Sequence, residues 1–328
     1  MKKVIITGGS GFIGSFIVRK FVNKKFKVLN LDKLSPVSQK LILKDKNYIF
    51  KNCNILNYSK LKKIVENFSP TIIIHCAAES HVDRSINLPK FFFQNNLLGT
   101  LNILDTIKTS KKKIRLIHIS TDEVFGSLKF NKKKFDSNSK YDPKSPYAAS
   151  KASSDFAVRS YGETFGINYS ITNCSNNYGP YQFPEKLIPV IIKSCILRTP
   201  IPIYGKGNNI RDWIHVSDHA NAIYKITLNG KNKETYLIGA NNEISNLKLA
   251  KIICDLFDKI YSFNESRKLI RFVEDRQGHD LRYSIDFSKT KNQIKWEPKI
   301  LFFEGLKKTI QFYYQNFKYL GKIFPYNK

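Results

Sequence analysis

The stretch Val4-Ile5-Ile6-Thr7-Gly8-Gly9-Ser10-Gly11-Phe12-Ile13-Gly14 decides the fold class of this chain. Its first residues are typical of a buried strand, its glycines form a GxxGxxG loop, and residues 12–24 have helical periodicity. Glycines let the backbone approach a pyrophosphate, which then lies on free N–H groups at the positive end of the helix. Because strand, loop and helix follow in the required order, the stretch predicts a dinucleotide site rather than a plain glycine turn.

A second strand follows at residues 26–31 and ends at Asp32. This carboxylate lies at about the ~20-residue offset expected for the group that holds the adenosine ribose. It would also repel a 2′-phosphate. The sequence therefore favours NAD over NADP.

Five residues further along combine a candidate oxidation site with a pair of acids: Thr121, Asp122, Glu123, Tyr147 and Lys151. The adjacent carboxylates would point to opposite faces of a regular strand, so both can address one substrate only where strand 114–121 ends and the backbone turns. The tyrosine and the lysine share one helix face. We expect the ammonium to lower the pKa of the phenol, so that Tyr147 takes a proton from a sugar hydroxyl.

Strands and helices alternate up to about Cys174, which implies right-handed crossovers and a doubly wound parallel sheet of Rossmann type. Strands are expected near Lys2, Phe26, Tyr48, Thr71, Ile114 and Ile167, and helices near Phe12, Tyr58, Asn87, Ser145 and Phe183. Later helices are expected at 216–228, 246–259 and 301–317. We expect an NAD-binding domain at 1–176, with a segment returning near 211–245, and a smaller mixed lobe for the substrate at 177–328. Residues 127–144 are expected to form a surface loop.

The composition fits an intracellular enzyme. The five cysteines lie far apart in the sequence, so no disulfide framework or metal site is expected. No apolar run is long enough to span a bilayer, and the first residues lack the features of a signal peptide, which favours a cytoplasmic location. The formal charge of +29 comes from lysines spread along the whole chain, which favours solvated faces over a nucleic-acid site.

Six blocks of sequence resemble one known family in the correct order. The chain is similar to the dTDP-glucose 4,6-dehydratases, which are extended short-chain dehydrogenase/reductases, over nearly its full length. The blocks are AAESHVDRS at 77–85, STDEV at 120–124, NCSNNYGP at 173–180, FPEKLIP at 183–189, YGKG at 204–207 with RDW at 211–213, and DRQGHD at 275–280.

The resemblance implies an NAD-dependent lyase of deoxysugar nucleotide (rhamnose-type) biosynthesis that acts on dTDP-glucose as a homodimer, without a metal, a membrane or a specific nucleic acid. The implied cofactor residues are Gly8, Gly11, Phe12, Ile13, Gly14, Asp32, Lys33, Asn54, Ile55, Ala77, Ala78, Asn96, Ser120, Tyr147, Lys151 and Asn173. The implied substrate residues are Ser80, Thr121, Asn176, Lys186, Leu187, Pro202, Tyr204, Arg211, Asn246, Arg276 and His279. Arg211 would clamp the diphosphate.

Four features depart from the family's pattern. Asn54 stands where an aspartate is usual near the adenine, Phe125 replaces a tyrosine, Gln277 replaces a proline, and the loop at 127–144 is short. None of these changes removes a catalytic group.

Two other functions stay open. A UDP-glucose 4,6-dehydratase or a sugar-nucleotide 4-epimerase would share the glycine loop, Tyr147 and Lys151, but an epimerase has no chemical use for Asp122 and Glu123. A catalytically silent, nucleic-acid-binding scaffold is the more distant alternative.

Overall fold

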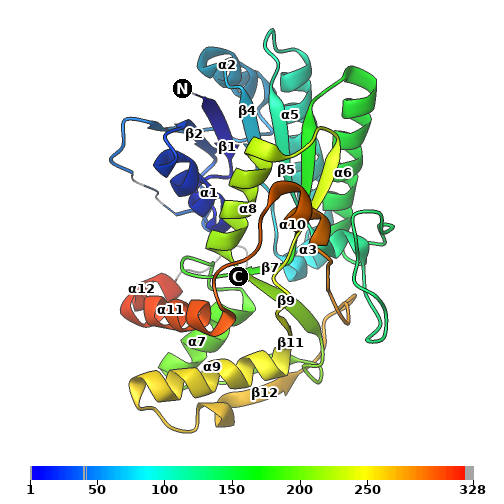
Figure 1. The fold of residues 1–328 in the computed structure, drawn as a ribbon. Coiled ribbons are helices and arrows are strands. Elements are labelled where there is room, and N and C mark those ends of the chain that lie inside the picture. Colours follow the sequence, from blue (N-terminus) through cyan, green and yellow to red (C-terminus); the bar gives the residue numbers. More distant parts are fainter. Residues whose placement is uncertain (1, 40, 42, 322–328) are drawn as a thin grey trace.

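A seven-stranded parallel sheet forms the centre of the molecule (Figure 1) in a computed structural model that describes residues 2–39, 41 and 43–321. In this part of the chain the strand order is β10-β6-β5-β4-β1-β2-β3. The doubly wound parallel sheet predicted from the sequence is therefore confirmed. The strands are β1 (Lys3–Thr7), β2 (Lys27–Asp32), β3 (Tyr48–Asn52), β4 (Ile72–His75), β5 (Arg115–Thr121), β6 (Tyr169–Cys174) and β10 (Glu234–Ile238).

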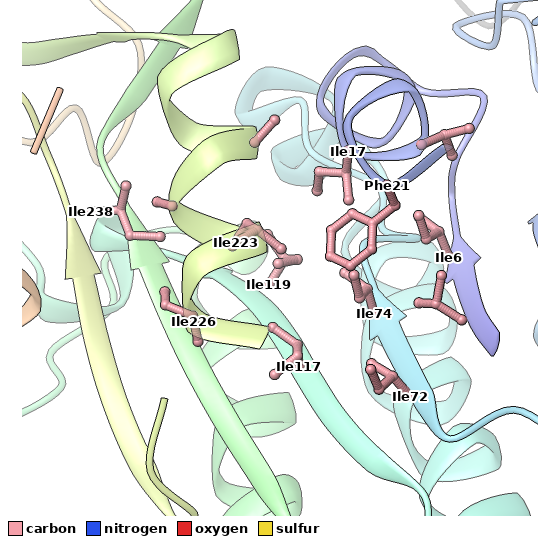
Figure 2. Close-up of a cluster of buried hydrophobic side chains, with 14 of the residues drawn as sticks. Ile6, Ile17, Phe21, Ile72, Ile74, Ile117, Ile119, Ile223, Ile226 and Ile238 are labelled. Carbon is pink, nitrogen blue, oxygen red and sulfur yellow. The ribbon is translucent and has the colours of Figure 1, made fainter. Parts of the chain in front are cut away.

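Helices cover both faces of this sheet, because alternate side chains of each strand point to opposite faces. Val4 and Ile6 belong to one buried cluster and Ile5 to the other. Figure 2 shows the first cluster, in which Phe21 lies among isoleucines of the strands. The helices on this face include α1 (Phe12–Asn23) and α8 (Val216–Asn229). Those on the other face include α2 (Tyr58–Phe68), α5 (Gly99–Lys108) and α6 (Pro146–Phe165).

The later half of the chain returns to the central sheet in two places. α8 packs against α1, and β10 pairs in parallel with β6. Further on, α10 (Ser288–Ile294) contacts β10 and α8, and Trp296 joins the same buried cluster. The sequence suggested a return near 211–245, whereas the segment around α10 was not expected.

A smaller lobe lies below the central sheet in Figure 1. It contains one three-stranded and one two-stranded sheet, with helices packed against them. The strands are β7 (Asn176–Tyr178), β8 (Ile201–Tyr204), β9 (Ile210–His215), β11 (Glu243–Ser245) and β12 (Ile270–Val273). The helices are α7 (Leu187–Leu197), α9 (Asn246–Tyr261), η3 (Ser266–Leu269), α11 (Phe302–Gln315) and α12 (Phe317–Leu320).

Two helical regions differ from the expectation. The helix expected near Asn87 is divided into α3 (Val82–Asn87), α4 (Pro89–Phe93), the π-helix η1 (Gln94–Leu98) and α5. Its first break is at Leu88, whose backbone is not helical, directly before Pro89. The helix expected near Phe183 begins only at Leu187, since Pro184 disfavours a helical conformation at the residue before it.

Residues 127–144 are more than a surface loop. Phe135 forms a bridge with Ile285, and its ring stacks on Phe125 with 5.2 Å between the centroids. The ring of Tyr141 packs against the edge of Phe125. Phe125 is therefore buried among apolar groups, so the tyrosine hydroxyl that the family usually has there is not needed for packing.

Candidate active site

The glycine loop between β1 and α1 forms one wall of the main cavity. Gly8 has a φ of +67°, which favours glycine, and a side chain at Gly14 would place its Cβ only 2.1 Å from the Gly8 carbonyl oxygen. Gly11 caps α1 and has no side chain that could accept a hydrogen bond from the first N–H groups of this helix. The N-terminus of α1 therefore has both the space and the donors to hold a pyrophosphate, so the residues present fit a dinucleotide.

Asp32 closes β2 beside this loop. Its Oδ2 accepts a hydrogen bond from the Ser10 N–H at 3.0 Å, and its Oδ1 accepts one from the Leu34 N–H at 2.8 Å. These bonds hold the carboxylate at the carboxyl edge of the sheet, where nucleotides bind in such folds. The nearby Asn54 Oδ1 already accepts a hydrogen bond from the Leu56 N–H at 3.0 Å.

The cavity has a volume of about 290 Å³ and extends from the glycine loop to the end of β5. Most of the residues that the resemblance implied for the cofactor line it, together with all five candidate catalytic residues and four of those implied for the substrate. The lining includes Gly8, Gly11, Phe12, Ile13, Gly14, Asp32, Lys33, Asn54, Ile55, Ala77, Ala78, Ser80, Ser120, Thr121, Asp122, Glu123, Tyr147, Lys151, Asn176 and Lys186.

Two residues implied for the cofactor lie behind this wall. The Asn96 Oδ1 accepts a hydrogen bond from the Glu79 N–H at 2.8 Å, and its Nδ2 donates to the Ser150 hydroxyl at 2.9 Å. Asn173 Nδ2 donates to the Thr121 carbonyl at 3.0 Å. Both side chains are buried and bind protein groups, so in this structure they support the cavity and do not line it.

The catalytic segment begins where β5 ends. Asp122 and Glu123 lie in a short 3₁₀ turn, η2 (Asp122–Phe125), which removes the strand alternation and lets both carboxylates line the cavity. Tyr147 lies in the first turn of α6, and the Ser145 hydroxyl caps this helix by accepting a hydrogen bond from the Ala148 N–H at 3.1 Å.

Burial raises the pKa of both acids in this segment. The pKa of Asp122 is raised well above its usual range by burial and by the neighbouring Glu123. The pKa of Glu123 is raised by burial, although Arg276 and Arg211 oppose the shift. Asp122 is therefore suited to donate a proton at neutral pH, and Glu123 has a higher basicity than an exposed glutamate.

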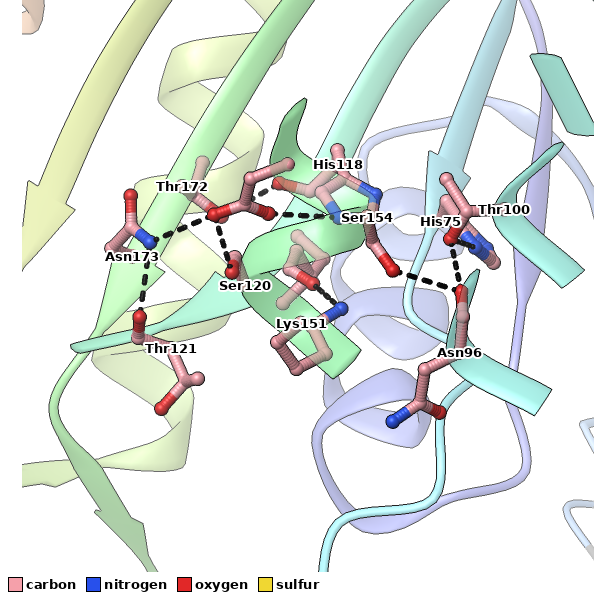
Figure 3. A network of polar contacts seen from close by, with 12 residues as sticks. His75, Asn96, Thr100, His118, Ser120, Thr121, Lys151, Ser154, Thr172 and Asn173 are labelled. Atoms are coloured by element: carbon pink, nitrogen blue, oxygen red, sulfur yellow. Dashed lines mark hydrogen bonds and ion pairs between the residues drawn. The ribbon is translucent and has the colours of Figure 1, made fainter. Parts of the chain in front are cut away.

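The pKa of Tyr147 is not lowered overall, although the neighbouring Lys151 predicted that it would be. The pKa of the phenol is raised well above its usual range, first by burial and then by Glu123 and Cys174, while the Thr121 hydroxyl lowers it. Lys151 Nζ instead donates to the Ile119 carbonyl at 2.8 Å (Figure 3), and burial lowers its pKa. The desolvation of both groups in a closed site explains why spacing on a helix face alone gave the wrong direction.

Three of the substrate residues, Lys186, Arg211 and Arg276, form a positively charged face near Glu123. Lys186 Nζ donates to the Ser80 carbonyl at 2.8 Å, and Arg211 donates to the Asp280 carbonyl at 2.9 Å. Arg211 also lies 4.2 Å from the Tyr283 ring centroid. Leu187, Pro202, Tyr204, Arg211, Asn246, Arg276 and His279 do not line the main cavity.

Asp83 connects this face to the segment that follows β4. It accepts hydrogen bonds from Arg276 at 3.1 Å and from the Tyr204 hydroxyl at 3.2 Å. His279 Nδ1 lies 2.6 Å from Asp275 Oδ1. Since Arg276, Arg211 and Lys186 all lower the pKa of Glu123, the face carries the positive charge that an anionic substrate needs.

Several cavity residues were missed from the sequence. Cys76 and Cys174 line the wall next to the ends of β4 and β6, and Arg84 forms a buried ion pair with Glu185 at 3.1 Å. The positions of the cysteines at the carboxyl edge of the sheet could have indicated them.

Within the described ranges, no group of three or more histidine, cysteine or acidic side chains is arranged to hold a metal, and no helix is long and apolar enough to cross a membrane.

Comparisons with known proteins agree with this geometry. A model of the GDP-mannose 4,6 dehydratase family matches residues 5–309. A dTDP-glucose 4,6-dehydratase from Salmonella typhimurium (strain LT2) is 42% identical over 98% of this chain and 95% of its own length. The structure of a dTDP-glucose 4,6-dehydratase from Streptomyces venezuelae, with NAD and TYD bound, is similar with a TM-score of 0.91 and 36% identity, and the match covers 97% of this chain and 98% of that one. A dTDP-glucose 4,6-dehydratase from Bacillus anthracis in complex with NAD gives a TM-score of 0.88 at 36% identity, with the same two coverages.

Proposed function

The chain belongs to the GDP-mannose 4,6-dehydratase family, and we propose that it is the NAD-dependent enzyme that converts dTDP-glucose to dTDP-4-keto-6-deoxy-glucose. The observation that carries this proposal is that one cavity contains the dinucleotide loop, Tyr147 and the two carboxylates of the η2 turn. The dinucleotide loop and Tyr147 serve an oxidation. The carboxylates serve the loss of water that follows it.

The N-terminus of α1 and Asp32 would hold NAD, and the bound cofactor would supply hydride acceptance from carbon 4 and hydride donation to carbon 6. In the oxidation Tyr147 takes the proton of the carbon 4 hydroxyl, and Thr121 donates a hydrogen bond to the forming ketone oxygen. Because burial raises the pKa of Tyr147, the phenol must first release its own proton to solvent, and the phenolate then takes the proton of the carbon 4 hydroxyl as the hydride leaves carbon 4.

The elimination uses the two acids of the η2 turn. The new ketone acidifies the hydrogen on carbon 5, which Glu123 removes as a base. Asp122, whose raised pKa keeps its proton near neutral pH, protonates the hydroxyl that leaves carbon 6. A proton is then restored at carbon 5, which gives the 4-keto-6-deoxy sugar.

The fate of individual hydrogen atoms tests this cycle. After incubation with dTDP-glucose in heavy water, the product should contain solvent deuterium at carbon 5, while the hydrogen added at carbon 6 comes from carbon 4 of the same molecule. A 4-epimerase would keep the carbon 6 hydroxyl and add no deuterium at carbon 5. UDP-glucose in a parallel reaction tests the nucleotide. If mass spectrometry shows no loss of water from either sugar nucleotide with NAD present, the proposed function is wrong.

We also propose that the enzyme acts in the cytoplasm as a homodimer. Supporting the dimer, three large apolar side chains on η1 and α6 are about half exposed: Leu98 at 48%, Phe156 at 58% and Phe165 at 45%. Light scattering after size-exclusion chromatography should give twice the chain mass, and a monomer mass at micromolar concentration would contradict the dimer.

A further inference from the structure

Asp155 is a fully buried carboxylate behind the active site and is not among the residues that line the cavity. It lies on α6, and one of its oxygens, Oδ2, accepts hydrogen bonds from three other parts of the fold. The donors are the Ser120 hydroxyl at 2.9 Å, the Tyr141 hydroxyl at 2.8 Å and Asn173 Nδ2 at 3.3 Å. One atom thus connects α6 to β5, β6 and the segment at 127–144.

These bonds meet where β5 turns into the catalytic segment. Ser120 directly precedes Thr121, and Asn173 Nδ2 also donates to the Thr121 carbonyl at 3.0 Å. Figure 3 shows Ser120, Thr121 and Asn173 together in this network. The position of Thr121 relative to Tyr147 on α6 therefore depends on a carboxylate that does not itself line the cavity.

The negative charge of Asp155 also interacts with the ammonium group of Lys151, which lies four residues before it on the same helix. Burial lowers the pKa of Lys151, and Asp155 raises it. Although burial raises the pKa of Asp155, its contacts with His118 and Lys151 lower it overall, so the carboxylate is an anion at neutral pH. Oδ1 lies 3.2 Å from His118 Nε2.

Other titratable groups face this pair from the surrounding elements. Cys76 and Cys174 raise the pKa of Lys151 by their proximity, and burial lowers the pKa of His118 and His75. With both histidines neutral and both thiols protonated, they add no permanent charge at neutral pH. Asp155 is therefore the anion that balances the buried ammonium. The groups facing the pair are His75 from β4, Cys76 after β4, His118 from β5, Cys174 from β6, Tyr141 from the 127–144 segment and Arg159 from α6.

We propose that Asp155 is a positioning residue for the oxidation step, which fixes the end of β5 against α6 and keeps Lys151 in its ammonium form. This inference rests on the proposed function, since it concerns Tyr147 and Lys151 as parts of one proton-transfer site. A neutral Lys151 cannot stabilise the phenolate that forms on Tyr147 when the phenol gives up its proton. Loss of the Asp155 charge should therefore act on the reaction through Lys151.

The pH profile of kcat for dTDP-glucose dehydration separates this role from simple packing. In Asp155→Asn, which keeps the shape of the side chain, the pKa of Lys151 falls further because its anionic partner is gone. The lysine then loses its proton at lower pH, so the alkaline limb of the profile should move to lower pH by about one to three units. Asp155→Ser, which is neutral and smaller, should move the limb in the same direction.

Tyr141→Phe is the matched control. It removes a buried hydrogen bond to the same Oδ2 atom but leaves the charge, and Asp155 stays ionised at alkaline pH with or without this bond. The alkaline limb of Tyr141→Phe should therefore coincide with that of the wild type, even where kcat is lower.

Three results would overturn the inference. They are an unshifted alkaline limb in the neutral Asp155 variants, an equal shift in Tyr141→Phe, and a failure of both neutral variants to fold, which would make Asp155 a structural residue. If the wild-type enzyme forms the expected product, none of these three results contradicts the proposed function. Absence of product from the wild type would instead refute the proposed function, and the inference with it.

Discussion

Asp32 Oδ2 accepts a hydrogen bond from the Ser10 N–H at 3.0 Å, so the carboxylate that ends β2 is fixed to the glycine loop that follows β1. Two segments that are separated in the sequence by α1 thus form one rigid rim of the cavity. A negative charge held at this position bears directly on the choice of cofactor.

The first prediction is that the protein binds NAD more tightly than NADP, because Asp32 repels a 2′-phosphate. Asp32→Ala should reduce the difference in the dissociation constants, measured by titration calorimetry. Asp142→Ala is a suitable control, since Asp142 is an exposed acid paired with Lys144 and should leave the preference unchanged. Equal or tighter binding of NADP by the wild type would contradict this prediction.

The second prediction separates oxidation from elimination. Tyr147→Phe should abolish the oxidation, whereas Asp122→Asn and Glu123→Gln should still oxidise carbon 4 but lose water about 10²- to 10⁴-fold more slowly. Stopped-flow absorbance should show transient reduced nicotinamide in the two carboxylate variants and none in Tyr147→Phe. Normal dehydration by both carboxylate variants would show that their roles are assigned wrongly.

The third prediction concerns the packing of the glycine loop. A Cβ at position 14 would lie 2.1 Å from the Gly8 carbonyl oxygen, so Gly14→Ala must displace the loop. Such overpacking costs about 1–3 kcal/mol, which, if it falls on the NAD-bound state, weakens NAD binding about 5- to 150-fold.

Gly166→Ala provides the comparison, because a Cβ there meets nothing within 4 Å. Its φ of +69° should lower the free energy of unfolding by about 1–2 kcal/mol. NAD binding should not change. Wild-type NAD affinity in Gly14→Ala would show that the loop tolerates the displacement.

The fourth prediction concerns the formal charge of +29. If the lysines are solvated, binding to random duplex DNA should be weak and should disappear between about 50 and 200 mM salt, since counterions compete for each phosphate contact. Fluorescence anisotropy with a labelled duplex measures this. Tight, salt-resistant binding to a defined sequence would instead support a nucleic-acid function.

The sequence by itself determined the elements and the parts of the site that come from local patterns. The period of the apolar residues indicated the strands β1 to β6, and the glycine loop indicated where a dinucleotide is held. The adjacent Asp122 and Glu123 could be placed at a strand end because strand geometry forbids them from sharing a face elsewhere. Each of these inferences depends on residues close together in the chain.

Only the tertiary structure decided the features that join distant segments. The packing of α10 and Trp296 on the central sheet, the ion pair of Arg84 with Glu185 and the contacts of Asp155 with three other elements leave no periodic signal in the sequence. The direction in which the pKa of Tyr147 is shifted is also decided only by the tertiary structure. Spacing on a helix places Lys151 near the phenol, but burial from all sides sets the direction of the shift, and burial exists only once the chain has folded.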